Sequence, residues 1–400
     1  MSSSGKKKSR WSWRRFASRH WRVCLALAFG FFLSLANYWV DNCPNSLIDD
    51  TGNLIFTEYL TDRYAHSEDI DSVLYVNVAY DKELVSLYDD FGDTLGTASV
   101  TNRATLLRFL QVAEEAGYRY MVLDVRFEPG MYTPADSALW TLMGRLPRFA
   151  YSAHSQSGDA AANLAGHNAA FADYSATMTT GFTRWQFFRS EGESIPLKMA
   201  GELNGVEINN HGLWYSDRGH ICRNALFIPL PSDLLLSEYP DGRVRYPNLG
   251  SQILRFKSEE EIAEMMHDKI VIIGDFGADT HETYIGPVPG PVLIYESYRQ
   301  LAAGHHRLNP LFYLLIFAFF SLMSWCVLRP GSLLGRIKWL EKHPILRFII
   351  SFISWNVTLK MLNIVCYLTL AENFITLIPS LFLTIADFLT VQPSKKQPSK

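Results

Sequence analysis

The sequence predicts a membrane protein of the α/β class: a mainly parallel sheet flanked by helices in an extracytoplasmic domain, plus four transmembrane α-helices. Two observations predict this class. Apolar runs are concentrated at residues 23–40 and again from residue 311 onward, and runs of this length are typical of membrane spans. The long stretch between them has mixed charge and short apolar segments in which strand and helix patterns alternate, as in parallel sheets covered by helices.

The composition agrees with apolar segments joined to an ordinary globular domain. Hydrophobic residues make up 48% of the chain, which is high for a wholly soluble protein. The formal net charge is only −3, so the charge balance indicates no nucleic-acid partner. The basic residues that do cluster lie beside the apolar runs, which indicates the lipid bilayer as the partner.

The first span is expected over residues 23–41, after a basic cytoplasmic segment of residues 1–22. Positive charge is retained on the cytoplasmic side of a membrane. A cleaved secretory signal is the alternative, but no small-x-small cleavage pattern follows the run, which ends in Asn37, Tyr38 and Trp39 as an uncleaved anchor does. The basic residues before the span are Lys6, Lys7, Lys8, Arg10, Arg14, Arg15, Arg19 and Arg22.

The C-terminal part predicts three more spans, the last two forming a hairpin that turns at Glu372 and Asn373. Basic residues place the loop after the second span and the C-terminal tail inside. Both termini are therefore expected in the cytoplasm and the main domain outside, as in a multi-pass protein of a bacterial inner membrane with a periplasmic domain. The expected segments are the domain over 42–308, spans over 309–328, 346–370 and 374–392, a cytoplasmic loop over 329–345 and a cytoplasmic tail over 393–400.

Two ionisable residues fall inside the predicted hairpin. Lys360 and Asp387 lie at comparable depth in the third and fourth spans if the hairpin turns at Glu372. A single charge at the centre of a span costs roughly 2.5–3.5 kcal/mol on insertion scales, so we expect these two to pair. The pair either fixes the packing of the hairpin or serves as a docking or signal-relay site.

The outer domain shows strands and helices in alternation. Residue 101 or 102 is expected to cap the first helix, which Gly117 ends. Residues 152–181 have no clear period, and the region around 155–225 leaves room for an inserted subdomain. Strands are expected over 72–78, 120–127, 149–153 and 269–276, and helices up to residue 115, over 134–146 and over 291–303.

Three polar residues lie at or after the carboxyl ends of predicted strands. Asp124 ends an otherwise apolar strand, and Asp279 and His281 follow the strongest strand. The carboxyl ends of parallel strands meet at one edge, where open α/β sheets bind ligands. A ligand pocket shared by these residues is one interpretation, and carboxylates that bond loop amides or pair with arginine are the other. We expect no metal, because no second histidine or cysteine pair completes a ligand set.

The remaining motifs are negative or ambiguous. No phosphate-loop, dinucleotide or serine-hydrolase pattern is present, so we expect no cofactor and no catalytic residue. Cys43 and Cys222 are the two cysteines of the outer region. They can form a disulfide if that compartment is oxidising, and two unrelated thiols are the alternative.

The order of residues from Asp268 to His305 is more specific. A strand ends in Ile272, Ile273 and Gly274, and a helix follows the Pro289–Gly290 pair. This resembles the C-terminal signature of the CHASE sensory domain, second subfamily. That family is an extracytoplasmic input module of bacterial cyclases and kinases, with one span before it and about three after it.

Two further stretches resemble the same family, and they add Arg103 and Asp136 to the ligand-binding candidates. The early strand departs from the family pattern, because Asn77 and Ala79 stand where paired acidic residues are usual. Tyr295 and Glu296 likewise replace a histidine–alanine pair. The further resemblance rests on Asn102, Arg103, Gly117, Asp124, Pro129, Asp136, Asp217, Arg218, Gly219 and Arg223.

The resemblance implies a sensor, but the predicted cytoplasmic segments are too short to fold as an output domain. We therefore expect an input subunit that binds a small molecule or an envelope partner and signals through a separate membrane or cytoplasmic output protein. A second copy of this chain is a further candidate partner. A structural or assembly subunit of an envelope complex is the alternative. An outward-facing hydrolase that uses Asp124, Asp279 and His281 is the third reading.

Overall fold

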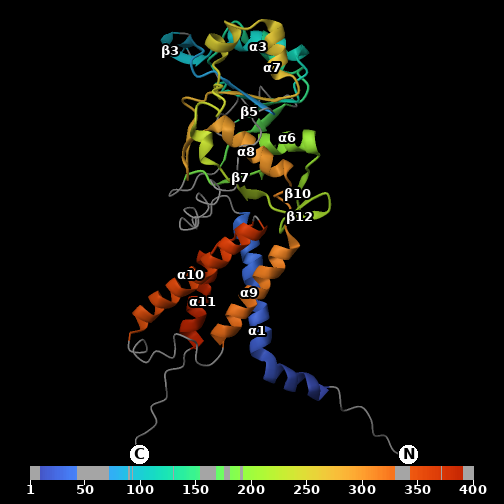
Figure 1. The fold of residues 1–400 in the computed structure, drawn as a ribbon, viewed down its shortest axis with the longest axis vertical. Coiled ribbons are helices and arrows are strands. Elements are labelled where there is room, and N and C mark those ends of the chain that lie inside the picture. The colour runs from blue at the N-terminus through green and yellow to red at the C-terminus, as the bar shows by residue number, and fades with distance from the viewer. Residues whose placement is uncertain are drawn as a thin grey trace, which may run out of the picture. The chain divides into compact units, whose positions relative to one another are not determined.

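The computed structural model describes residues 10–42, 72–88, 91, 93–128, 130–153, 168–174, 181–189, 192–328, 343–370 and 372–390. The chain forms two compact units. One contains the described residues 72–307 and is called the α/β domain here, and the other contains the described residues 10–42 and 308–390 and is called the helical unit. Figure 1 shows both.

A five-stranded parallel sheet forms the centre of the α/β domain. The strand order is β1-β14-β4-β5-β6, so the chain returns after nearly two hundred residues to place β14 between β1 and β4. The register is regular: Val73 pairs with Ile270, and Ile270 pairs with Tyr120. The predicted parallel sheet is confirmed, with strands β1 (Val73–Asn77), β4 (Tyr120–Asp124), β5 (Phe149–Ala153), β6 (Ala169–Phe171) and β14 (Ile270–Gly274).

Helices cover both faces of this sheet, as Figure 1 shows for the pairs α3/α7 and α6/α8. Alternation along β4 builds two cores, because successive side chains of a strand point to opposite faces. Tyr120 and Val122 join the core with α6 and α8, and Met121 and Leu123 join the core on the other face. The helices are α3 (Arg103–Glu115), α4 (Asp136–Met143), η2 (Leu249–Leu254) and α7 (Glu259–Met266) on one face, and α6 (Ile195–Asn204) and α8 (Gly290–Ala302) on the other.

Capping residues set the helix ends. The Asn102 side chain accepts the backbone N–H of Thr105 at 2.9 Å and starts α3, which selects Asn102 over Thr101 as the predicted cap. Ser258 and Glu261 form a capping box at the start of α7. The helix expected over 134–146 is shorter, and the strand expected over 120–127 ends at Asp124.

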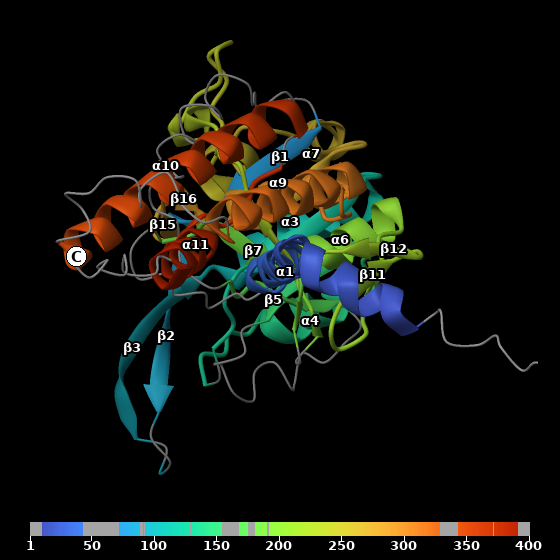
Figure 2. The same cartoon turned by 90° about the horizontal axis from the view of Figure 1, so that it is seen from below.

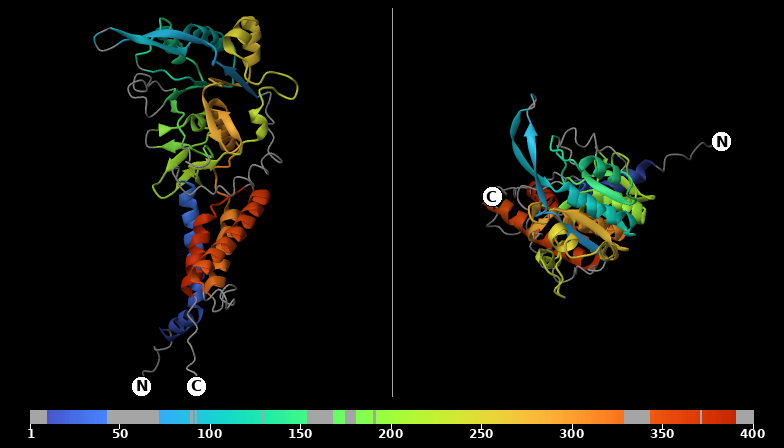
Figure 3. Two further views of the ribbon diagram at one scale, coloured as in Figure 1. Left: turned by 90° about the vertical axis from the view of Figure 1, so that its left-hand side faces the viewer. Right: turned by 90° about the horizontal axis from the view of Figure 1, so that it is seen from above.

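Small antiparallel sheets complete the domain. Figures 2 and 3 show the β2–β3 hairpin extending away from the body of the domain. Trp185 and Leu226 of the β7–β13 pair belong to the same core as the central sheet, so the described part of 155–225 is no separate subdomain. The elements are β2 (Lys82–Tyr88), β3 (Thr94–Thr101), β7 (Arg184–Gln186), β8 (Phe188–Arg189), β9 (Gly192–Glu193), β10 (Ile208–Asn210), β11 (Tyr215–Asp217), β12 (His220–Cys222), β13 (Ala225–Phe227), η1 (Ser232–Leu235), β15 (Thr280–Thr283) and β16 (Gly286–Pro289).

The helical unit contains α1 (Arg10–Asp41), α9 (Pro310–Leu328), α10 (Pro344–Leu370) and α11 (Leu377–Thr390). Three of its helices are long and apolar enough to cross a membrane, over His20–Val40, Pro310–Leu328 and Pro344–Leu370. The fourth predicted span differs from expectation. Its helix begins at Leu377 and has 14 residues, which rise about 21 Å against a hydrocarbon core of about 30 Å.

Small residues let α1 and α9 pack closely. A side chain at Gly30 would bring its Cβ within 2.8 Å of the backbone nitrogen of Ser321. Ser34, one turn later, turns its hydroxyl back to the carbonyl of Gly30 at 2.9 Å. Such small-residue contacts are how helices associate in membranes, where neither lipid nor protein offers a hydrophobic driving force.

Candidate functional site

A polar cavity lies at the carboxyl edge of the central sheet, and we call it the edge pocket. Parallel register aligns Asn77 with Gly274 and Gly274 with Asp124, so the loops that follow β1, β14 and β4 emerge side by side. They enclose a cavity of about 460 Å³. The structure thus brings Asp124 and Asp279 together in one pocket, as the sequence predicted. Its charged lining residues are Lys82, Asp124, Arg126, Glu128, Asp275 and Asp279.

Two residues at the strand ends shape these loops. The Asn77 side chain accepts backbone N–H groups from Ala79 at 2.9 Å and Phe276 at 3.2 Å, and so ties the turn after β1 to the turn after β14. Gly274 is needed for close packing, because a Cβ there would come within 3.2 Å of the carbonyl oxygen of Asp124 and would overlap Pro291.

Lys82 and Asp275 form an ion pair within the lining, with Nζ 2.8 Å from Oδ2. The other carboxylate oxygen of Asp275 accepts the N–H groups of Gly277 at 3.0 Å and Ala278 at 2.7 Å. Burial alone would raise the pKa of Asp275, but the Lys82 ammonium and these N–H groups outweigh it and hold the pKa below the ordinary value. Asp275 is therefore an anion at neutral pH and pairs with Lys82.

The edge pocket has an excess of negative charge. Four carboxylates line it against two cations, Lys82 and Arg126. Both cations have carboxylate partners within the lining, Asp275 for Lys82 and Glu128 for Arg126, whose Nε–Oε1 distance is 3.1 Å. The lining as a whole therefore attracts a positively charged group. Asp124, which is 9% exposed, and Asp279 both belong to it.

His281 lies beside the edge pocket and is not part of its lining. Its Nε2 is 2.9 Å from Oδ1 of Asp279, and its ring packs edge-on against Tyr174 at 4.7 Å between centroids. Gly290, the first residue of α8, packs against both side chains, and its N–H donates to the Asp279 carbonyl at 2.8 Å. Among the described residues, no serine, threonine or cysteine side chain is hydrogen-bonded to His281.

Arg103 and Asp136 pair with each other away from the pocket lining. The Nε–Oδ1 distance is 3.8 Å, and the guanidinium lies 4.0 Å from the ring centroid of Phe127. Thr133 donates to Asp136 through both its N–H and its hydroxyl, at 3.0 and 3.1 Å. These contacts assign Arg103 and Asp136 to the support of the loop after β4.

The remaining sequence-based expectations concern a metal ion and a disulfide. The part of the chain that the structure describes contains no group of three or more His, Cys, Asp or Glu side chains arranged for a metal ion. Cys222 is buried, which raises the pKa of its thiol to about 12. Its suggested partner Cys43 lies outside the described residues, so the disulfide stays a prediction.

A buried cluster around Asp217 was not predicted from the sequence. Both Asp217 and His306 are 0% exposed, and Oδ2 of Asp217 lies 2.9 Å from Nε2 of His306 and 2.9 Å from Nε of Arg307. Oδ1 accepts the N–H of Glu207 at 3.0 Å. The resemblance had singled out Asp217, but nothing local relates it to a histidine 89 residues later.

In the helical unit, the structure corrects the predicted partner of Asp387. Arg347 lies 3.6 Å from Oδ2 of Asp387 and donates to its carbonyl at 3.2 Å, and the Ser351 hydroxyl also donates to the carboxylate. Lys360 lies thirteen residues further along α10, roughly 20 Å by helix rise. The predicted pairing of Lys360 with Asp387 was therefore wrong. Helix α11 starts at Leu377, and its C-terminal end contacts the N-terminal end of α10.

No family model, no curated protein and no solved structure matches this chain. The resemblance to the CHASE family therefore stays a prediction.

Proposed function

We propose that this chain is a membrane-bound sensor or binding subunit whose α/β domain binds a small, positively charged molecule in the edge pocket. The observation that carries the proposal is that Asp124 and Asp279, which follow neighbouring parallel strands, line one cavity with an excess of carboxylates. The domain faces the periplasm of a bacterium, and the signal passes to a separate membrane or cytoplasmic protein.

The chemistry of the pocket favours an amine over an anion or an apolar ligand. A protonated amine has three donors, and its hydrogen bonds to carboxylates are charge-assisted. Four carboxylates against two cations give the lining an excess of negative charge, which attracts a cation.

A continuous stretch of chain leads from the pocket to a membrane helix. Helix α8 begins at Gly290, which packs against Asp279. Residues 303–309 join α8 to α9, and within them His306 and Arg307 are bound to Asp217. A change in the position of α8 on ligand binding is transmitted along this stretch to α9.

Four crossings and an outward domain remain part of the proposal. The flanking basic residues support the orientation. Five non-helical residues precede α11, and each adds up to about 3.5 Å to its reach. Non-helical backbone is tolerated at membrane depth where protein satisfies its polar groups. Here Asn363 accepts the N–H of Phe374 at 2.8 Å, and Asn37 accepts that of Ile375 at 3.1 Å.

The test is a thermal-stability screen of the full chain in lipid nanodiscs against polyamines, amino sugars and amino acid amides, each with a neutral counterpart of the same shape. A ligand at 100 times its Kd adds about 2.7 kcal/mol of stability. Asp124→Asn and Asp279→Asn should each weaken the affinity about tenfold or more, because each removes a charge-assisted hydrogen bond.

Glu115→Gln is the matched control, because Glu115 is an exposed carboxylate on α3 outside the pocket lining. It removes the same charge from the same domain and should leave the affinity unchanged. A screen without any stabilising amine, or equal losses in Glu115→Gln and Asp124→Asn, contradicts the proposal.

A structural or assembly subunit is the second candidate. The residues that depart from the CHASE pattern favour it, because their contacts are structural. The Asn77 side chain accepts backbone N–H groups of two loops, and the Tyr295 hydroxyl bonds Ser72 at 3.0 Å. Glu296 is buried and pairs with Arg299 at 3.0 Å. Recovery of a stoichiometric partner on detergent purification, together with a flat ligand screen, would select this candidate.

A further inference from the structure

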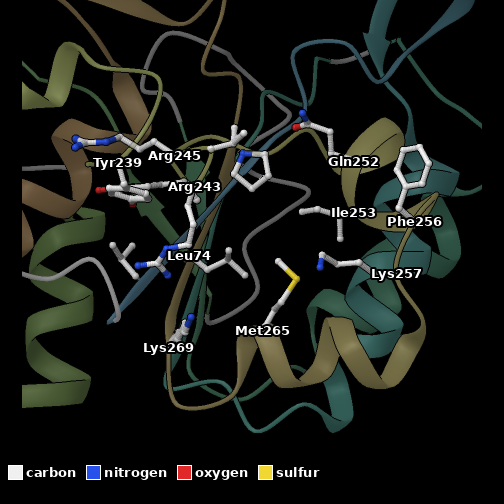
Figure 4. Close-up of a pocket in the computed structure, with 14 residues that line it drawn as sticks. Leu74, Tyr239, Arg243, Arg245, Gln252, Ile253, Phe256, Lys257, Met265 and Lys269 are labelled. Carbon is white, nitrogen blue, oxygen red and sulfur yellow. The ribbon is translucent and has the colours of Figure 1, made fainter. Parts of the chain in front are cut away.

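A second cavity of the α/β domain lies beside the edge strand β1, and we call it the basic pocket. Its volume is about 570 Å³, which is within the range of small-molecule sites. Figure 4 shows Tyr239, Arg243, Arg245 and Lys269 on one side of the view and Gln252, Phe256 and Lys257 on the other. None of the lining residues that the structure describes is acidic.

Arg245 is a buried cation with unused bonding capacity. It is 3% exposed, and its guanidinium lies 4.7 Å from the ring centroid of Tyr239. Its nearest anion is Asp233, with 3.6 Å between Nη2 and Oδ2. Within the described part of the chain, Nε has no hydrogen-bond partner. A buried donor without an acceptor is costly, so the site favours an acceptor from outside the chain.

Three more cations line the same cavity. Lys257 and Lys269 are half-buried and form no ion pair with any other residue that the structure describes. Arg243 pairs with Asp241 at 2.7 Å on the surface. Asp241 and Asp233 are not part of the lining, so the cavity itself has a positive potential.

The walls of the cavity are largely apolar, and one side is the open edge of the sheet. Val73, Leu74 and Tyr75 of β1 belong to the lining. The N–H of Asn77 bonds the carbonyl of Pro247, on the side away from β14. Alternate residues of a parallel strand direct their N–H groups to the same side, so that of Tyr75 also faces away from β14. The apolar walls suit a hydrocarbon body and the donors suit an anionic head.

From this arrangement we infer that the basic pocket binds an amphipathic organic anion, with an aromatic or aliphatic body and a carboxylate-type head. The four cations and the free Nε of Arg245 hold the head. Leu74, Val244, Ile253, Phe256 and Met265 contact the body. This site has the opposite charge to the edge pocket and does not depend on the function proposed for it.

The test uses 2-naphthoate as the probe, with 2-naphthalenemethanol and 2-naphthylmethylamine as neutral and cationic probes of the same body. Binding to the full chain in nanodiscs of zwitterionic lipid is measured by isothermal titration calorimetry. We expect naphthoate to bind at least about tenfold more tightly than the neutral probe, because its head makes charge-assisted hydrogen bonds. Raising the salt concentration should weaken naphthoate binding and leave the neutral probe unaffected.

Lys257→Gln and Lys269→Gln should each weaken naphthoate binding about five- to tenfold, since each removes a partly solvated charge. Arg108→Gln is the matched control, because Arg108 is exposed on α3 outside this lining. Both lysines are partly exposed, so the variants keep the thermal unfolding of the parent, which avoids the folding risk of replacing buried Arg245. Equal affinity for the three probes, or equal losses in Arg108→Gln and Lys269→Gln, overturns the inference. Asp124→Asn should leave naphthoate binding unchanged, which separates this test from that of the edge pocket.

Discussion

Replacing Asp217 by alanine is expected to lower the free energy of unfolding of the α/β domain by about 3–5 kcal/mol, the usual effect of breaking a buried charge pair. Asp217 and His306 are both fully buried, and three donors converge on the carboxylate. Without it, the Glu207 N–H and the Arg307 guanidinium lose their acceptor. Denaturant unfolding of the full chain, followed by tryptophan fluorescence, measures the loss.

The same cluster predicts a pH dependence. Burial alone would raise the pKa of Asp217, but the N–H of Glu207 and the side chains of His306 and Arg307 hold it below the ordinary value. The stability that the lowered pKa contributes is complete above the unfolded-state pKa of about 3.9 and is lost as the pH falls through the lower folded-state pKa. Burial lowers the pKa of His306. The stability that this lowered pKa contributes is therefore lost as the pH falls below about 6.5. Below about pH 3.9, Asp217→Ala should therefore lose stability less steeply than the parent as the pH falls, because the titrating carboxylate is gone.

The control is Glu114→Ala, which breaks the solvent-exposed ion pair between Glu114 and Arg145. Exposed pairs contribute about 0–1 kcal/mol, so this variant should stay close to the parent. If Asp217→Ala and Glu114→Ala lose equal stability, the buried cluster does not anchor the chain between α8 and α9.

Removing one partner of the Arg347–Asp387 pair is expected to be nearly as damaging in the helical unit. Both side chains are buried within the unit, and an unpaired charge there costs about 3–5 kcal/mol. Asp387→Leu alone removes the carboxylate that pairs with Arg347, and Arg347→Leu alone removes the guanidinium that pairs with Asp387. The double variant removes both charges and should recover most of the stability of the parent.

Thermal unfolding in detergent, read as a double-mutant cycle, gives the coupling energy between the two residues. Lys360→Leu with Asp387→Leu is the matched cycle for the pair that the sequence had suggested. Additive losses for Arg347 and Asp387, or a larger coupling for Lys360 and Asp387, would contradict the observed pairing.

The parts of the fold that the sequence predicted well are those with strong local signals. The apolar strands at 120–124 and 270–274 are buried on both faces, and a continuous apolar run of that kind is typical of the centre of a parallel sheet. Asn102 has the side chain of a helix cap and serves as one. The convergence of Asp124 and Asp279 followed from the rule that parallel strands share a carboxyl edge.

The parts that were missed depend on contacts between distant segments. Strand β6 has only three residues, which is too short to show a period in the sequence, and its pairing with β5 is what makes it a strand. The match of Asp387 with Arg347 depends on where α11 begins, which is Leu377 and not the expected residue 374. The basic pocket combines β1 with residues 239–269, and no motif in the sequence joins cations so far apart.

We propose that the α/β domain lies outside the cytoplasm while the loop between α9 and α10 lies inside. The most direct test labels intact cells with a membrane-impermeant maleimide, in a chain whose native cysteines are replaced by alanine. A single cysteine introduced by Arg108→Cys, at an exposed position of the domain, should be labelled in intact cells. One introduced by Ser332→Cys should react only after lysis. Labelling of Ser332→Cys, with none of Arg108→Cys, would contradict the account.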